Sequence, residues 1–268
     1  MLLHSILDFI FPRFCEICKK RLEIEENVIC TSCLECLPKT KWWINERPTK
    51  KKYRPDDNIF QEEENKELIL DVSEWKEKDR KQLFEENILA QKYWGRVTVT
   101  RAMSFLKFAP KTQTANLVYA FKYEQKDDVA RFMGKMMGQE LGNVGFYEGI
   151  DYIVPVPLTL KREMTRGYNQ CTELAKGISS ITGIKIAERI LKRTHFKKSQ
   201  TKLDGIARKT NIEGAFALDK KAGLVANSHI LLVDDIITTG ATTIECCKVL
   251  QKIQGIRISI LSLGIVSL

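Results

Sequence analysis

The chain has 268 residues, a formal net charge of +9 and a hydrophobic share of 44%. These values are typical of a globular protein with one catalytic-sized domain and a small accessory module, and they exclude disorder throughout. The positive charge favours an anionic partner, whether nucleic acid, an anionic membrane or a polyphosphorylated small molecule.

The first 40 residues are expected to form a zinc-ribbon-like module, because five of the eight cysteines crowd into them. Two Cys-x-x-Cys pairs have the spacing that brings two thiolates each to one tetrahedral ion. The predicted ligands of a structural zinc are Cys15, Cys18, Cys30 and Cys33. Cys36 is in register to replace Cys33, and reduced thiols or an iron–sulfur centre remain as alternatives.

The apolar start of the chain lacks a basic n-region, contains Asp8 and is interrupted by Pro12. We therefore expect neither a signal peptide nor a membrane span, and we place the protein in the cytoplasm. Residues 41–93 are expected to be a charged insert or linker, because more than half of residues 46–86 are charged.

From residue 94 to residue 268, strands alternate with helices, which predicts an α/β domain with a mostly parallel sheet covered on both faces. In chain order we expect a strand at 97–108, helices at 113–123 and through 129–141, a strand at 152–156, a helix through 174–181, an extended segment at 186–194, a polar and basic segment at 195–210, a strand at 230–233, a helix at 241–254 and a strand at 256–263.

The strongest chemical signal follows the apolar run 230–233. That run predicts a buried parallel strand with Asp234 and Asp235 at its carboxyl end, where open α/β sheets bind ligands. Gly240 can adopt positive φ, and hydroxyls at the start of the next helix add donors for a phosphate. The predicted phosphate cradle consists of Thr238, Thr239, Gly240, Ala241 and Thr242. A surface turn followed by N-capping threonines is the plainer interpretation, but the whole string is too long and too ordered for it.

Adjacent carboxylates repel each other unless vicinal hydroxyls or a divalent cation lie in front of them. A ribose 2′,3′-diol beside a 5′-phosphate would supply such hydroxyls to Asp234 and Asp235.

This string resembles the phosphoribosyl-diphosphate loop of type I phosphoribosyltransferases. Other segments resemble the ComF family, competence-associated phosphoribosyltransferase-like proteins with an N-terminal zinc-binding segment. They comprise 153–158, Arg162, 166–170, Gln200, Leu203, Arg208, Asn211 and 214–216. Tyr168 stands where the family pattern would have Phe. The resemblance covers residues 1–40 and roughly 88–268, and it implies a type I phosphoribosyltransferase fold.

The resemblance also implies a reaction, in which phosphoribosyl diphosphate binds with Mg²⁺ and passes its phosphoribosyl group to a nitrogen acceptor. Asp234 and Asp235 would hold the sugar, and Arg166 would be the third catalytic residue. The remaining substrate-binding residues would be Lys161, Arg162, Gln200 and Arg208. The segment 195–210 would close over the substrate. On composition alone, a solvated basic face or a basic surface loop explains the same residues.

A second hypothesis is a non-catalytic competence protein that handles single-stranded DNA through the zinc module and basic loops, with a competence helicase as a partner. The sequence shows no alternation of aromatic and basic residues of the kind that forms a stacking platform. Glutamine-dependent amidophosphoribosyl transfer is disfavoured, because residues 1–94 offer neither a glutaminase domain nor its N-terminal nucleophilic Cys. The identity of the acceptor does not follow from the sequence.

Overall fold

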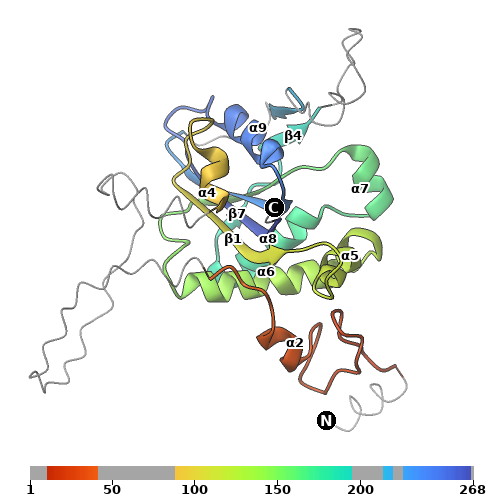
Figure 1. Cartoon of the computed structure of the whole chain (residues 1–268). Helices are drawn as coiled ribbons and strands as arrows, with labels where there is room; N and C mark the ends of the chain where they lie inside the picture. Colours follow the sequence, from red (N-terminus) through yellow and green to blue (C-terminus); the bar gives the residue numbers. More distant parts are fainter. Residues whose placement is uncertain (1–10, 42–87, 195–213, 220–225, 267–268) are drawn as a thin grey trace, which may run out of the picture.

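A parallel sheet forms the centre of the protein (Figure 1). The structure, a computed structural model, describes residues 11–41, 88–194, 214–219 and 226–266. The strand order is β1-β7-β6-β2-β3, and each neighbouring pair is parallel. The strands are β1 (Arg101–Phe108), β2 (Tyr152–Pro155), β3 (Lys185–Ile186), β6 (His229–Ile237) and β7 (Arg257–Val266). This topology confirms the predicted α/β fold class, a mostly parallel sheet flanked by helices.

Helices cover both faces of the sheet. They are α4 (Ile88–Tyr93), α5 (Ala115–Tyr123), α6 (Asp127–Gly142), α7 (Leu160–Arg166), α8 (Gln170–Thr182) and α9 (Ala241–Leu250). On one face, α5, α6 and α8 enclose an apolar core with the N-terminal segment. On the other face, α4 and α9 enclose a second core. Helices on both faces explain why the central strands read as nearly continuous apolar runs.

Several element bounds differ from the sequence prediction: the strand expected from residue 97 begins at Arg101, and the helix expected to end at residue 254 ends at Leu250. Two further differences concern the sheet. The segment 186–194 does not form one extended strand: it divides between β3 and β4 (Leu191–Arg193), and β4 pairs antiparallel with β5 (Phe216–Leu218) in a separate two-stranded sheet. The strand predicted at 230–233 continues to Ile237, because its pairing with β7 extends to Ile265. Asp234 and Asp235 therefore lie within β6 rather than after it.

The contact between α6 and α8 depends on two glycines. A Cβ atom on Gly134 would lie 2.2 Å from the Leu174 carbonyl oxygen, and one on Gly177 would lie 2.2 Å from that of Arg131. Because both obstacles are backbone atoms, the helices approach this closely only without side chains at these positions.

The cysteine segment, residues 11–41 with the short helix α2 (Thr31–Glu35), packs beside α5 and α6 (Figure 1). It also pairs with the outer edge of β1. The Thr40 N–H donates to the Phe105 carbonyl at 2.9 Å, and the Lys107 N–H donates to the Pro38 carbonyl at 2.7 Å. The segment thereby covers a sheet edge that would otherwise carry unpaired backbone groups.

The range 41–93, which the sequence assigns to a charged insert, is described only at its ends, since residues 42–87 lie outside the described part. Residues 88–93 form α4, whose Leu89 and Tyr93 are buried against the second core. Within the described residues, no helix combines the length and the apolar character needed to cross a membrane.

Candidate functional site

The two acidic residues of β6 face opposite sides of the sheet, as successive strand residues do. Asp235 points to the side of α5, where its Oδ2 lies 2.8 Å from Nζ of Lys122. Asp234 is on the other side and only 8% exposed. Its Oδ1 accepts hydrogen bonds from the Asp235 N–H at 2.9 Å and from the Cys171 thiol at 3.6 Å.

The environment of Asp234 changes its acidity. Burial and the neighbouring Asp235 carboxylate raise the pKa of Asp234 from its ordinary value of 3.8 to about 7. The repulsion expected between the adjacent acids is thus relieved in two ways: Asp234 can hold a proton near neutral pH, and Lys122 offsets the charge of Asp235.

The predicted phosphate cradle forms the turn between β6 and α9. Gly240 has a φ of 76°, the left-handed conformation that glycine adopts without steric strain. Thr238 and Thr239 are exposed, and the Thr239 hydroxyl accepts a hydrogen bond from the Ala241 N–H at 3.4 Å. Thr242 is partly exposed in the first turn of α9. The hydroxyls thus surround a helix N-terminus, which attracts anions through its free N–H groups and its dipole.

Thr243, which the sequence analysis did not single out, holds the turn in place from its buried side. Thr243 is fully buried and donates to the Gly240 carbonyl at 2.9 Å, and its hydroxyl also lies 2.8 Å from that of Tyr93 on α4. These contacts fix the glycine turn against the body of the domain.

The basic residues that follow β2 lie on α7. The Thr159 hydroxyl caps this helix by accepting from the Arg162 N–H at 3.3 Å, and Gly167 ends it with a φ of 80°. Lys161 and Arg162 are exposed. The Arg166 guanidinium lies 5.7 Å from the centre of the Tyr123 ring on α5, within the range of a cation–π contact. The structure therefore joins Arg166 to α5 rather than to either acidic residue.

Two exposed aromatic residues accompany Arg166. Tyr119 and Tyr123 are 50% and 68% exposed, and their ring centres lie 5.7 Å apart on α5. The sequence analysis missed this group because Arg166 is distant in the chain. The sequence did offer one indication of this group: Tyr119 and Tyr123 are four residues apart in a predicted helix and therefore share a face of it.

Gln170, the first residue of α8, is fully buried. Neither atom of its amide has a hydrogen-bond partner among the described residues. Such a group is costly unless water or a ligand satisfies it. It precedes Cys171, the residue that contacts Asp234. Gln200 and Arg208, by contrast, lie outside the described residues, as does the whole segment 195–210.

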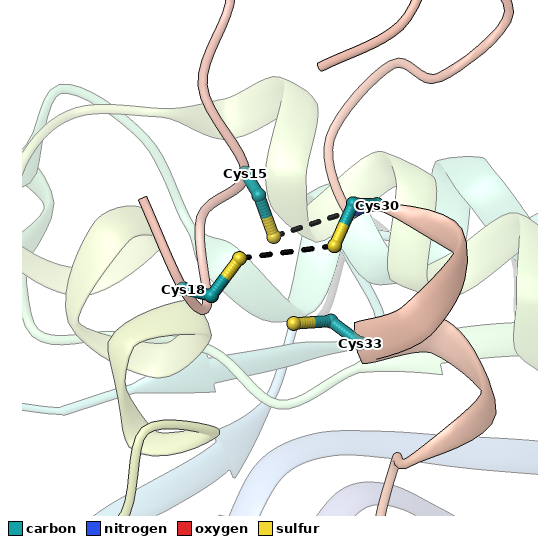
Figure 2. Close-up of side chains that lie close together, drawn as sticks. All are labelled: Cys15, Cys18, Cys30 and Cys33. Carbon is teal, nitrogen blue, oxygen red and sulfur yellow. Dashed lines mark hydrogen bonds between the residues drawn. The ribbon is translucent and has the colours of Figure 1, made fainter. Parts of the chain in front are cut away.

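The cysteine segment brings four thiols together (Figure 2). The sulfur atoms of Cys15, Cys18, Cys30 and Cys33 all lie within 4.8 Å of one another. The Cys18 and Cys30 sulfurs are 3.7 Å apart, and a tetrahedral zinc with about 2.3 Å bonds separates its sulfur ligands by about 3.8 Å. Cys36 is exposed and lies outside this group. The four side chains therefore fit a metal ion, with Cys33 rather than Cys36 as the fourth member.

The four thiols differ in acidity. Burial opposes ionisation of Cys15, but hydrogen bonds from the backbone N–H groups of Cys18, Cys30 and Ile17 outweigh it and lower the pKa of Cys15 to about 7. Burial and the neighbouring sulfurs raise the pKa of Cys33. A cation between the sulfurs would offset the burial and the repulsion that disfavour ionisation of these thiols, because it stabilises all four thiolates at once.

Comparison with known proteins places the chain near two named groups of bacterial proteins. No family model matches the chain. DNA utilization protein YhgH of Salmonella typhi is 29% identical over 139 residues, which cover 51% of this chain and 60% of that protein. The Escherichia coli K12 protein of the same name is 28% identical over 155 residues, covering 57% and 66%. Competence protein F of Haemophilus influenzae is 37% identical over 101 residues, covering 38% and 44%.

These matches confirm the resemblance to the ComF family, and the chain spans between 44% and 66% of the length of these curated relatives. The solved structures that match part of the chain include phosphoribosyltransferases. The glutamine phosphoribosylpyrophosphate amidotransferase from B. subtilis is 18% identical, with a TM-score of 0.35 over 53% of this chain and 30% of that one. A hypoxanthine phosphoribosyltransferase from Staphylococcus aureus is 19% identical, with a TM-score of 0.31 over 52% and 62%.

Proposed function

We propose that the protein is a phosphoribosyltransferase, a glycosyltransferase of pentosyl groups, that binds phosphoribosyl diphosphate with Mg²⁺ at the carboxyl edge of β6. One observation carries the proposal: a carboxyl pair, Asp234 and Asp235, is separated by two residues from an exposed threonine turn at the start of α9. Carboxylates accept hydrogen bonds from a sugar diol, and a helix N-terminus binds a phosphate. Their proximity in the chain suits a ribose 5-phosphate.

In this reaction the acceptor nitrogen forms a bond to the anomeric carbon, and the bond from that carbon to the diphosphate oxygen breaks. The two electrons of the broken bond leave with diphosphate, and the proton that the acceptor nitrogen loses passes to solvent. Asp235 would hold a ribose hydroxyl, and Asp234, with a pKa of about 7, can exchange a proton near neutral pH. Arg166, Lys161 and Arg162 supply positive charge for the leaving group. When bound, Mg²⁺ would neutralise charge on the diphosphate.

The biological setting that we propose follows the names of the relatives, a competence protein and DNA utilization proteins. Phosphoribosyl transfer would then serve DNA uptake or the salvage of nucleotides in the cytoplasm. Four thiolates leave no open coordination position for water, so the zinc that we propose at the cysteine cluster has a structural role.

A direct binding measurement tests the proposal. Isothermal titration of the full chain with phosphoribosyl diphosphate and Mg²⁺ should give binding that the double variant Asp234→Asn, Asp235→Asn abolishes. Asp128→Asn, an exposed residue of α6, is the matched control and should bind like the wild type. Equal binding by the double variant and the wild type would refute the site. Screening nucleobases and amines for Mg²⁺-dependent release of diphosphate would then identify the acceptor.

Binding of single-stranded DNA, with a competence helicase as a further partner, is the second candidate function. It is supported by Tyr119, Tyr123 and Arg166, an exposed aromatic and basic group of the kind on which bases stack. Replacing both tyrosines with Ala should weaken oligonucleotide binding, and wild-type affinity should fall steeply with salt. Affinity insensitive to salt and to the tyrosines would exclude this role for the group.

A further inference from the structure

The cysteine module and the candidate site touch the same helix, α5. Near the start of α5, the Asn116 amide donates to the Ile17 carbonyl at 3.0 Å. Three residues beyond its end, Nζ of Lys126 lies 2.7 Å from Oε1 of Glu16. Lys126 is the N-cap residue of α6, and its N–H donates to the Ala120 carbonyl of α5 at 3.4 Å. Ile17 and Glu16 both lie between Cys15 and Cys18, so the first cysteine pair contacts the start of α5 and the turn that follows its end.

Between these attachments, α5 contributes three contacts to the opposite side. Lys122 pairs with Asp235, Tyr123 lies under the Arg166 guanidinium, and the Phe121 carbonyl accepts a hydrogen bond from the Tyr168 hydroxyl. A helix of nine residues is a short rigid element, so a shift at its module end also moves its last turn. Lys122 thus lies six residues after one contact with the cysteine pair, at Asn116, and four residues before the other, at Lys126.

We propose that Asn116 and Lys126 are positioning residues for the candidate site: by tying α5 to the cysteine module they set Lys122 against Asp235 and so tune binding of phosphoribosyl diphosphate. This inference rests on the proposed function. It assigns the module a role beyond covering the edge of β1, because the folded state of the module then affects the Asp235 carboxylate.

The structure provides a matched control. The module also contacts α6, where Nζ of Lys39 lies 2.6 Å from Oε1 of Glu140. That ion pair is of similar length to the one at Lys126 and is also half-buried, but it lies near the C-terminal end of α6, away from the turn that joins α5 to α6. Loss of the Lys39 contact should loosen the module without moving Lys122, so it separates an effect on α5 from a general effect on the module.

The experiment compares the full-length double variant Asn116→Ala, Lys126→Gln with Lys39→Gln, after metal content has been checked in each. Hydrogen exchange followed by mass spectrometry should be faster in residues 115–123 of the double variant only. Titration with phosphoribosyl diphosphate and Mg²⁺ should give a dissociation constant about fivefold higher for the double variant, the scale of one or two exposed polar contacts, and unchanged for Lys39→Gln. Lys126→Arg with Asn116 intact should behave like the wild type.

A double-mutant cycle with Lys122→Gln tests whether the effect passes through Lys122. In the Lys122→Gln background, the Asn116 and Lys126 substitutions should cause no further loss of affinity. An additive loss, an equal loss for Lys39→Gln, or unchanged exchange in α5 would overturn the inference. If the wild type failed to bind phosphoribosyl diphosphate, the proposed function would fall, whereas faster exchange in α5 would still show that the module holds this helix.

Discussion

Lys122 Nζ lies 2.8 Å from Asp235 Oδ2, and this ion pair joins α5 to the centre of the sheet at the candidate site. Neither side chain is strongly exposed, so solvent screens the pair less than it would a surface pair. The ligand that we propose carries a phosphate and a diphosphate, both anionic, and the ammonium offsets the carboxylate that would otherwise repel them.

Replacing Lys122 with Gln should therefore raise the dissociation constant for phosphoribosyl diphosphate about tenfold, corresponding to about 1.4 kcal/mol. Isothermal titration checks this. Lys135→Gln, an exposed position on α6, should leave affinity unchanged. Similar affinities for both variants would mean that Lys122 contributes no charge to the ligand site.

The pH dependence of stability should report the raised pKa of Asp234. Because its pKa is about 7 in the folded protein and 3.8 as the ordinary value, the folded state binds more protons between these pH values. The free energy of unfolding should thus fall as pH rises from about 4 to 7 and then level off. Asp234→Asn removes this loss and should therefore gain stability relative to the wild type as the pH rises to 8.

Urea unfolding at pH 5 and pH 8 measures the difference between the Asp234→Asn variant and the wild type. The difference in free energy of unfolding, variant minus wild type, should be larger at pH 8 than at pH 5. A constant gap would show that the carboxyl titrates normally in the folded state.

Metal content should separate Cys33 from Cys36. The sulfur of Cys33 belongs to the four-cysteine group, whereas Cys36 is exposed outside it. Cys33→Ser should lose most of the zinc found by elemental analysis of the purified chain, because a fourth thiolate is removed. Cys36→Ser should retain about one zinc per chain, as one four-thiolate site implies. Loss of zinc in Cys36→Ser alone would reverse the assignment.

A methyl group between α6 and α8 should destabilise the fold. At Gly134 it would meet the Leu174 carbonyl oxygen at 2.2 Å, which only backbone movement can relieve. We expect Gly134→Ala to lower the free energy of unfolding by about 2 kcal/mol, as for other overpacked positions. Gly142→Ala, in the same helix but with no atom within 4 Å of the added Cβ, should be neutral or slightly stabilising. Denaturant unfolding distinguishes the two variants, and equal stabilities would contradict the close contact.

Local patterns predicted the elements that depend on neighbouring residues. The alternation of predicted strands and helices along the chain indicated a parallel sheet with helices on both faces, and the positive φ of Gly240 followed from the turn that a strand and a helix require there. The two Cys-x-x-Cys pairs similarly indicated one tetrahedral cluster, because each pair is closed by a short local loop. In these cases the interacting residues are close in the chain, or the order of strands and helices along the chain is regular enough to indicate how the strands pair.

Only the tertiary structure decided which distant side chains meet. Lys122 and Asp235 are separated by more than 100 residues and come together because α5 packs on the face of the sheet to which Asp235 points. The position of Asp234 within β6, and hence its raised pKa, follows from how far β6 and β7 pair. The chain sequence alone determined which chemical groups are present and their local conformations, whereas packing of helices on the sheet determined their charge states and neighbours, because burial and Coulomb interactions depend on distance in space.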